Sequence, residues 1–543
     1  MKIIRIIFLL AFVFIGSLSQ VLASEKSVKE DFNKLINIQN QIKKIYPQIL
    51  DCTVSIGAGC SGVIVSEDGY ILTASHVIEM FENTKGKITV KLKDGIERDV
   101  ERFGRNMAGD FALLKLKDEG KWPFAKIGSS SELNSNELCL MLGHSTGYQE
   151  GRPAVLRTGF VRGFTKTGFL RTSCTMMPGD LGGPLFNLDG ELIGINSYCW
   201  EKEFENYFSP SDRILKNWDA LLDGGVHEPK HPNYYSKEIV KANLADSPYV
   251  LSKSYDNLSL AIEGNGSTKS NKVYPIYLLN DDDQLIIHAT QITNDGVLVS
   301  KSSLIKEKAV RCKLKDGTFV RLEVIGRSDE NDLVYLHSKE IANENQLLIK
   351  NKIEIGDFIG LLNVNNEIDL SGVIGVGTRN IPVLTAGMFG MEMEGLKVTK
   401  VYDNSNSFLG GIKDGDEIIS INSKVFKNKD EYDVFMKNTC PNQIVDLQIK
   451  RGDKEVETEV KLGPFPPKQH PADFVELSGK KEGFANAFTF DISIKPVDCG
   501  APLLNLDGEV VGVSIARSTR TCSYAIPIDV ILNEYNKLSK KMN

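Results

Sequence analysis

From about residue 52 onward, the chain consists of short apolar runs separated by Gly, Asp and Asn. Representative runs are 62–65, 70–72, 88–92 and 112–116. Many short β-branched runs, with turn residues roughly every 8–12 positions, are typical of antiparallel sandwiches and barrels. The pattern therefore predicts a mostly β protein.

Two segments depart from this pattern. Residues 28–46 carry apolar side chains at helical spacing, and Pro47 is expected to end the helix, which we place at 24–46. A second helical pattern covers residues 214–222 and ends at Gly224-Gly225. Residues 225–276 are interpreted as a linker and helical connector.

The first residues have the features of a secretory signal peptide. Lys2 and Arg5 precede the apolar run 6–15, and Val21-Leu22-Ala23 suits a signal peptidase, so we place the signal at 1–23. The apolar run is shorter than the roughly 20 residues that span a bilayer. We therefore expect a secreted or periplasmic protein without a membrane span in the mature chain. An uncleaved membrane anchor is the alternative.

The second half of the chain repeats the first. Three blocks recur in the same order: 69–78 with 296–305, 109–114 with 331–336, and 178–190 with 496–508. Asp110 and Leu181 lie 71 residues apart, whereas their counterparts Asp332 and Cys499 lie 167 apart. The excess predicts a small domain inserted in the second copy, at residues 386–463.

Composition narrows the functional classes. The chain has 543 residues, 41% hydrophobic and 25% charged, and a net charge of −7. This length suggests about three folded domains, and the acidic balance argues against nucleic acid as a partner. No Cys or His cluster has zinc spacing, so we predict neither metal nor cofactor. Among nine cysteines, the pairs Cys52–Cys60 and Cys499–Cys522 are possible, but sequence does not fix connectivity.

The repeated blocks resemble those of trypsin-like peptidases. Such an enzyme needs a hydroxyl nucleophile, an imidazole base, a carboxylate that orients it, and backbone N–H donors for the oxyanion. Thr73-Ala74-Ser75-His76 resembles the histidine block, Gly109–Leu114 the aspartate block, and Pro178–Pro184 the nucleophile turn. From about residue 47 to 537, the chain is most similar to the HtrA/Deg family of exported serine peptidases.

This resemblance implies a fold and a set of site residues. It implies two trypsin-like double β-barrel domains with a PDZ domain inserted in the second. His76 and Asp110 would be triad remnants, and the amides of Gly179 and Leu181 would resemble an oxyanion hole. Phe389-Gly390-Met391 would form the peptide-binding loop and adjoining strand of the PDZ domain. The resulting domain plan is 1–23 signal peptide, 24–46 helix, 47–224 first trypsin-like domain, 225–276 connector, 277–385 and 464–543 second trypsin-like domain, and 386–463 PDZ domain.

Both copies depart from the family pattern at a residue that the chemistry needs. Leu181 stands at the first nucleophile position. The second copy keeps Asp332 and offers Cys499 as a nucleophile, but Ser303 stands at its histidine position. Losing the nucleophile costs a serine protease about 10⁶-fold in turnover. We therefore predict a pseudoprotease that binds peptide segments or C-termini of exported proteins. The family resemblance leaves a homo-oligomer open, because many relatives assemble in this way.

Two alternatives remain open from sequence. The chain could be a serine-type endopeptidase of protein quality control with a non-standard nucleophile. That nucleophile would be one of the hydroxyls of Thr172, Ser173 and Thr175, or Cys499 paired with His76 across an interface. Alternatively, Leu181 only fills space and the cleft binds nothing.

Overall fold

The computed structural model describes most of the chain. The described residues are 32–57, 59–83, 86–177, 179–199, 206–227, 273–277, 285–341, 349, 352–383, 387–403, 405–436, 439, 443–463 and 475–542. The predicted signal peptide, residues 24–31 of the predicted helix and most of the predicted connector lie outside these ranges. No described helix is both long and apolar enough to cross a membrane.

The first part of the fold is a pair of six-stranded barrels. The strands of barrel 1 are β1 (Thr53–Ile56), β2 (Cys60–Ile64), β3 (Tyr70–Thr73), β4 (Thr89–Lys91), β5 (Glu97–Asn106) and β6 (Phe111–Leu116). They run in the order β5-β4-β1-β2-β3-β6 and close through β5 and β6, and β13 (Val226–His227) adds to β5. The strands of barrel 2 are β7 (Leu138–Gly143), β8 (Val155–Phe164), β9 (Leu170–Thr172), β10 (Pro184–Phe186), β11 (Leu192–Cys199) and β12 (Asn206–Pro210). We call barrels 1 and 2 the first barrel pair.

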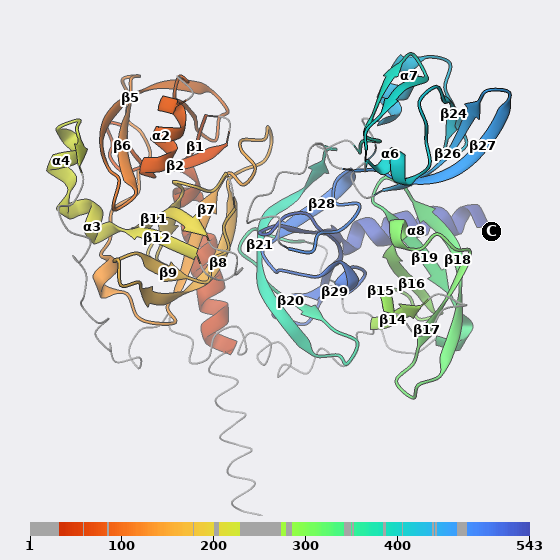
Figure 1. Ribbon diagram of the computed structural model, residues 1–543. Coiled ribbons are helices and arrows are strands. Elements are labelled where there is room, and N and C mark those ends of the chain that lie inside the picture. The colour runs from red at the N-terminus through yellow and green to blue at the C-terminus, as the bar shows by residue number, and fades with distance from the viewer. Residues whose placement is uncertain are drawn as a thin grey trace, which may run out of the picture.

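A second barrel pair repeats this arrangement (Figure 1). The strands of barrel 3 are β14 (Val273–Tyr277), β15 (Leu285–Gln291), β16 (Val297–Lys301), β17 (Ala309–Lys313), β18 (Phe319–Ser328) and β19 (Leu333–His337). Those of barrel 4 are β20 (Phe358–Leu362), β21 (Ile368–Ile381), β28 (Phe484–Phe490), β29 (Pro502–Leu504), β30 (Val510–Arg517) and β31 (Ser523–Pro527). Strand neighbours follow the same order as in the first pair. The predicted fold class, two trypsin-like double barrels, is therefore confirmed.

A separate small domain interrupts barrel 4 between β21 and β28, as the excess spacing predicts (Figure 1). Its elements are β22 (Met391–Glu394), β23 (Lys397–Val401), α6 (Asn406–Leu409), β24 (Glu417–Ile421), β25 (Lys424–Val425), α7 (Lys429–Met436), β26 (Ile444–Arg451) and β27 (Lys454–Lys461). It has its own hydrophobic core, distinct from the one shared by the barrels. This separation is what an inserted domain requires.

The remaining helices lie around the barrels. They are α2 (Ser75–Asn83), α3 (Ser211–Lys216), α4 (Trp218–Leu222) and α8 (Ile528–Met542), with 3₁₀ turns η1 (Ser130–Glu132), η3 (Ser302–Leu304), η4 (Lys339–Ile341) and η6 (Pro496–Asp498). Helices α3 and α4 cover the predicted helical pattern. The C-terminal helix α8 was not predicted.

The N-terminal helix runs through residues 32–51, so the prediction that Pro47 ends it is wrong. A proline inside a helix removes one hydrogen bond and costs about 3 kcal/mol. Here Pro47 lies on the exposed face, while Ile45 and Ile49 on either side of it are buried. Burying an isoleucine contributes about 1.5–3 kcal/mol, so continuing the helix compensates for the proline.

This helix connects the two barrel pairs. Its Gln39 Oε1 accepts a hydrogen bond of 2.7 Å from the Phe358 N–H in barrel 4, and Lys43 pairs with Asp357 at 2.5 Å. On the other side, Gln41 donates to the Leu188 carbonyl at 2.8 Å. The helix's buried isoleucines belong to one hydrophobic core that includes residues of both pairs.

We predict that Ile42→Ala lowers the free energy of unfolding by about 2–5 kcal/mol, the usual cost of truncating a buried isoleucine. Ile42 is fully buried, and a Cβ at Gly356 would lie 2.9 Å from its Cγ2, so the packing there is tight. Urea denaturation followed by circular dichroism measures the change. Lys44→Ala, on the exposed side of the same helix, is the control. Equal midpoints for the two variants would contradict this role of the helix.

Candidate functional site

His76 and Asp110 form a hydrogen-bonded pair in the first barrel pair. His76 lies at the start of α2, directly after β3, and Asp110 lies in the turn between β5 and β6. The His76 Nδ1 is 2.9 Å from Asp110 Oδ2 and 3.0 Å from Oδ1, and the His76 backbone N–H donates to Oδ1 at 3.1 Å. Ser197 also donates to Asp110 Oδ2. A carboxylate on Nδ1 leaves Nε2 as the basic nitrogen, the arrangement of a general base with its orienting group.

The orienting aspartate sits in a strained turn in both repeats. Asp110 has φ 52° and Asp332 has φ 55°, in the left-handed region that non-glycine residues seldom occupy. Such conformations cost on the order of 1–3 kcal/mol and need support from their surroundings. Near Asp110, Asn106 Oδ1 accepts the Gly109 N–H at 2.8 Å, and Ser209 donates to the Asp110 carbonyl at 3.0 Å.

The turn at residues 179–183, where the sequence predicts an oxyanion hole, is held by hydrogen bonds to Ser61. Gly179 has φ 103°, a value that a side chain would make costly. The Gly179 carbonyl accepts a 2.7 Å hydrogen bond from the Ser61 hydroxyl, and the Leu181 carbonyl accepts one of 2.9 Å from the Ser61 N–H. Within the described part of the chain, neither the Gly179 N–H nor the Leu181 N–H has a hydrogen-bond partner. Oxyanion holes are built from backbone donors of this kind.

A buried ion pair between Arg157 and Asp180 supports this turn. Asp180 accepts hydrogen bonds of 2.6 Å from both terminal nitrogens of Arg157 on β8, and neither side chain is exposed. Asp180 also accepts from Ser145 at 2.8 Å and from the Met177 N–H at 3.0 Å. Each oxygen of the carboxylate therefore has at least two donors, which compensate for its burial away from solvent.

The three hydroxyls weighed from sequence as replacement nucleophiles belong to the wall of barrel 2. The Leu181 side chain is half-buried and packs against the barrel core. Of the three hydroxyls weighed from sequence, Thr172 accepts the Cys174 N–H at 3.1 Å and Ser173 accepts the Phe160 N–H at 2.9 Å. Thr175 is buried. These side chains belong to the barrel wall before the turn.

In the second barrel pair, Lys301 forms an ion pair with Asp332. Its ammonium group lies 2.8 Å from Asp332 Oδ2 and is fully buried, and Ser303 donates to the same carboxylate oxygen at 2.8 Å. Sequence reasoning found Ser303 at the histidine position but missed Lys301. A lysine at the end of the buried strand β16, where the first copy has Ala74, was the available signal.

We predict that Lys301→Ala lowers the free energy of unfolding by about 3–5 kcal/mol, because it removes the nearest cation from a buried carboxylate and leaves only Lys480, at 3.7 Å, to offset its charge. The double variant Lys301→Met with Asp332→Asn should recover most of that loss, since it removes both charges. Thermal and urea unfolding measure both variants, with exposed Lys308→Ala as the matched control. A Lys301→Ala protein as stable as the control would disprove the role of the ion pair.

The backbone around Cys499 has a different conformation from that around Leu181, although the two residues align in sequence. Val497 stands where the first copy has Gly179, and the segment forms the 3₁₀ turn η6, in which the Cys499 N–H donates to the Pro496 carbonyl at 3.3 Å. One of the two oxyanion donors is thereby consumed. The thiol is fully buried, 3.7 Å from the Ser478 hydroxyl, and burial raises the pKa of Cys499 to about 11. At neutral pH, such a thiol is neither accessible nor ionised.

The two cysteine pairs considered from sequence are not formed. All eight described cysteines, including those at 52, 60, 499 and 522, carry free thiols. Cys522 packs against Val155 and Val376, where the two barrel pairs meet, whereas Cys499 faces Ser478. Because the Cys499 thiol is fully buried, it is not accessible to the His76 ring, and the structure does not bring this base and thiol together.

The predicted peptide-binding loop lies at the start of β22. Gly390 has φ 77°, and the carbonyl of the buried Phe389 accepts bonds from the Ser407 N–H at 2.8 Å and from its hydroxyl at 2.7 Å. Strand β22, which begins at Met391, is the edge strand of its sheet, and among the described strands it pairs with β23 alone. An unpaired strand edge beside such a loop can receive an extended peptide as a further strand.

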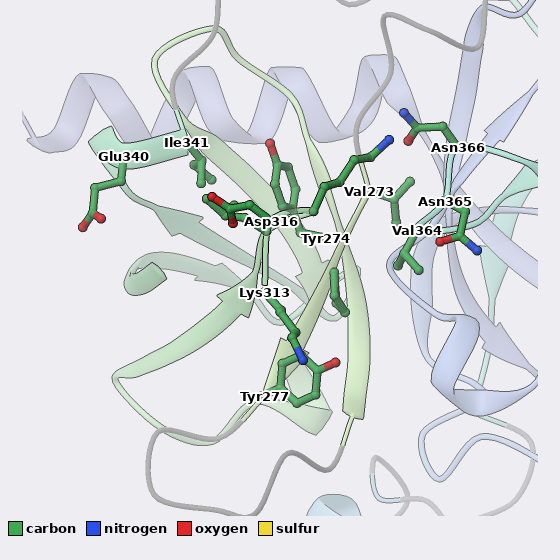
Figure 2. A pocket seen from close by; sticks show the side chains of 13 residues that line it. Val273, Tyr274, Tyr277, Lys313, Asp316, Glu340, Ile341, Val364, Asn365 and Asn366 are labelled. Carbon is green, nitrogen blue, oxygen red and sulfur yellow. The ribbon is translucent and has the colours of Figure 1, made fainter. Parts of the chain in front are cut away.

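A hollow of about 930 Å³ lies elsewhere in the second barrel pair (Figure 2). Tyr274 and Tyr277 of β14, Lys313 at the end of β17, and Asn365 of the turn between β20 and β21 line it (Figure 2). None of the candidate site residues is among its described lining. The described residues also contain no group of three or more His, Cys, Asp or Glu side chains that could hold a metal ion.

Comparisons with known proteins agree with this architecture. Residues 60–195 match the trypsin-like peptidase domain family, and residues 372–462 match the PDZ domain family. The chain is 37% identical over 145 residues to a probable periplasmic serine endoprotease DegP-like of Pseudomonas fulva. It is 33% identical over 178 residues to the putative protease Do-like 14 of Arabidopsis thaliana.

These two matches span 26% and 29% of the chain, but only 29% and 42% of the relatives' own lengths. A DegP-like protein of Pseudomonas savastanoi is 26% identical over 407 residues, which are 74% of the chain and 77% of that protein. The crystal structure of a serine endoprotease from Yersinia pestis aligns at 16% identity with a TM-score of 0.30, covering 79% of the chain and 98% of its own.

Proposed function

Because the chain belongs to the HtrA/Deg family of trypsin-like peptidases with PDZ domains, we propose that it is an exported pseudoprotease that binds peptide segments without cutting them. The observation that carries this proposal is Leu181. It occupies the nucleophile position of a site whose His76–Asp110 pair is hydrogen-bonded. Export accords with the relatives' names, which describe periplasmic proteins.

The energetic argument concerns the covalent step. Acyl transfer needs an oxygen or sulfur atom that bonds to the substrate carbonyl, and losing it costs about 10⁶-fold in turnover, or about 8 kcal/mol of transition-state stabilisation. A hydrocarbon side chain offers no such atom. The second cleft supplies none either, because Cys499 is buried and Asp332 is paired with Lys301.

The parts of the first cleft that bind rather than react are present. The amides of Gly179 and Leu181 can donate to a peptide carbonyl, and the Leu181 side chain adds apolar surface beside them. The edge strand β22 is a second place for an extended chain. Together they fit a protein that holds unfolded segments or C-termini. Assembly as a homo-oligomer is included in the same proposal.

We expect wild-type protein to retain denatured casein but not to hydrolyse it, and Leu181→Ser to gain hydrolysis of about 10³-fold or more over wild type. The new hydroxyl would join a base, an orienting carboxylate and two amides already in position. Release of fluorescent fragments from labelled casein measures the rate. Leu181→Ala controls for the smaller side chain, and Leu181→Ser with His76→Ala should be inactive again.

The retained His76–Asp110 geometry favours one other function, a serine-type endopeptidase whose nucleophile comes from a rearranged segment. Fluorophosphonate labelling of wild-type protein distinguishes the two. Covalent labelling with casein turnover, both abolished by His76→Ala, would establish the endopeptidase and end the pseudoprotease proposal. No labelling together with casein retention supports the binder.

Peptide capture by the PDZ domain is tested separately. We predict that Gly390→Ala weakens binding of C-terminal peptides by about tenfold, because the new Cβ would lie 2.7 Å from the Ser405 Cβ and displace the loop. Gly452→Ala is the matched control: it has φ 61° in the hairpin of the same domain but open space around it. Fluorescence anisotropy with a peptide library measures affinity. Equal weakening in both variants would refute a specific role for the loop.

A further inference from the structure

Two buried thiols of barrel 2 lie in contact. The Cys139 Sγ, on β7, is 3.7 Å from the Cys174 Sγ, two residues after β9. Both side chains have zero exposure and pack in the same small hydrophobic cluster. Among the eight described cysteines, this is the one pair whose sulfur atoms lie within hydrogen-bonding range of each other.

A glycine on the strand between them allows this contact. Gly159 on β8 pairs with Cys139 in the barrel register, and its carbonyl accepts the Cys139 thiol at 3.5 Å. A Cβ at Gly159 would lie 2.6 Å from the Cys174 Sγ and 2.3 Å from the Cys174 N. Without that side chain, the two thiols approach each other over the β8 backbone.

We propose that Cys139 and Cys174 are a redox modification site, which forms an intramolecular disulfide when the chain folds in an oxidising compartment. The oxidant is a disulfide, either a small-molecule one or that of a thiol–disulfide exchange protein. This inference is independent of whether the cleft cuts peptides.

The thiol–disulfide exchange proceeds in two steps. The thiolate of one cysteine attacks the oxidant's disulfide, forms a mixed disulfide and releases one thiol. The second cysteine then displaces the remaining half as a second thiol. The Cys139–Cys174 bond forms, and the two electrons and two protons lost by the cysteines end on the two sulfurs of the oxidant.

The burial of both thiols determines at which stage of folding the disulfide forms. The oxidant cannot reach fully buried thiols, and desolvation raises the pKa of Cys139 well above its ordinary value, so little thiolate exists in the closed barrel. The bond therefore forms while β7, β8 and the segment after β9 are still assembling. Once the barrel has closed, the same burial protects it from reductants.

The bond would constrain the segment that leads to the candidate cleft. The Thr175 carbonyl, one residue after Cys174, accepts a 3.4 Å bond from Arg157, and the Met177 N–H donates to Asp180. A covalent tie at Cys174 would fix the start of this segment to β7. Its effect would be to stabilise the turn that presents the Gly179 and Leu181 amides.

The test is refolding of the full chain with reduced and oxidised glutathione, followed by denaturation and alkylation. We expect two fewer alkyl labels than the nine of the fully reduced chain, a Cys139–Cys174 peptide in non-reducing mass mapping, and a higher urea midpoint than for reduced protein. Cys139→Ala and Cys174→Ala should each lose the cross-linked peptide and the midpoint shift. Cys312→Ala, a buried cysteine in barrel 3, should keep both.

The proposal fails if wild-type protein takes up all nine labels after oxidative refolding, or if the cross-link maps to another pair. It also fails if the bond forms without raising the urea midpoint, because the stabilising role would then be absent. Since oxidised and reduced wild type are compared directly, the result does not depend on whether the alanine variants fold.

Discussion

The ion pair between Arg157 and Asp180 is the interaction on which the candidate cleft depends. Removing either partner would leave an isolated charge in a dry barrel, a cost of several kcal/mol, so the two side chains hold each other in one geometry. Asp180 directly precedes Leu181, so the same constraint fixes the turn. The turn is thus maintained by its surroundings and not by the residue at the nucleophile position.

The two copies of the fold depart from the trypsin-like pattern in different ways. In the first, the hydrogen-bonded His76–Asp110 pair is kept and Leu181 stands at the nucleophile position. In the second, the geometry itself has changed: Asp498 caps a 3₁₀ turn, Val497 cannot adopt the conformation of Gly179, and Lys301 neutralises the aspartate. The first copy therefore differs from the family pattern in a side chain, whereas the second differs in its backbone as well.

Sequence alone predicted the fold well because the repeat and the strand periodicity are local signals. Alignment placed Asp332 and Cys499 opposite Asp110 and Leu181, and the barrels have the same strand order. It could not reveal that Cys499 is enclosed, because burial arises from segments distant in sequence, and the lysine at the end of β16 was only an indirect signal of its pairing with Asp332. The prediction that Pro47 ends the helix is wrong for a similar reason. The local cost of the proline is outweighed by the packing of the neighbouring isoleucines against the barrels.

The second barrel pair also bears on the first cleft through β8. Successive residues of a strand point to opposite faces, so Arg157 reaches Asp180 while Thr158 turns towards the second pair. There Asp491 accepts the Thr158 N–H at 2.9 Å and its hydroxyl at 3.1 Å, and the Val373 N–H of β21 at 2.6 Å. The strand that carries the supporting arginine is therefore held from both sides. The second barrel pair thus contributes to the rigidity of the strand that supports the turn at Asp180, which gives it a physical role in the fold.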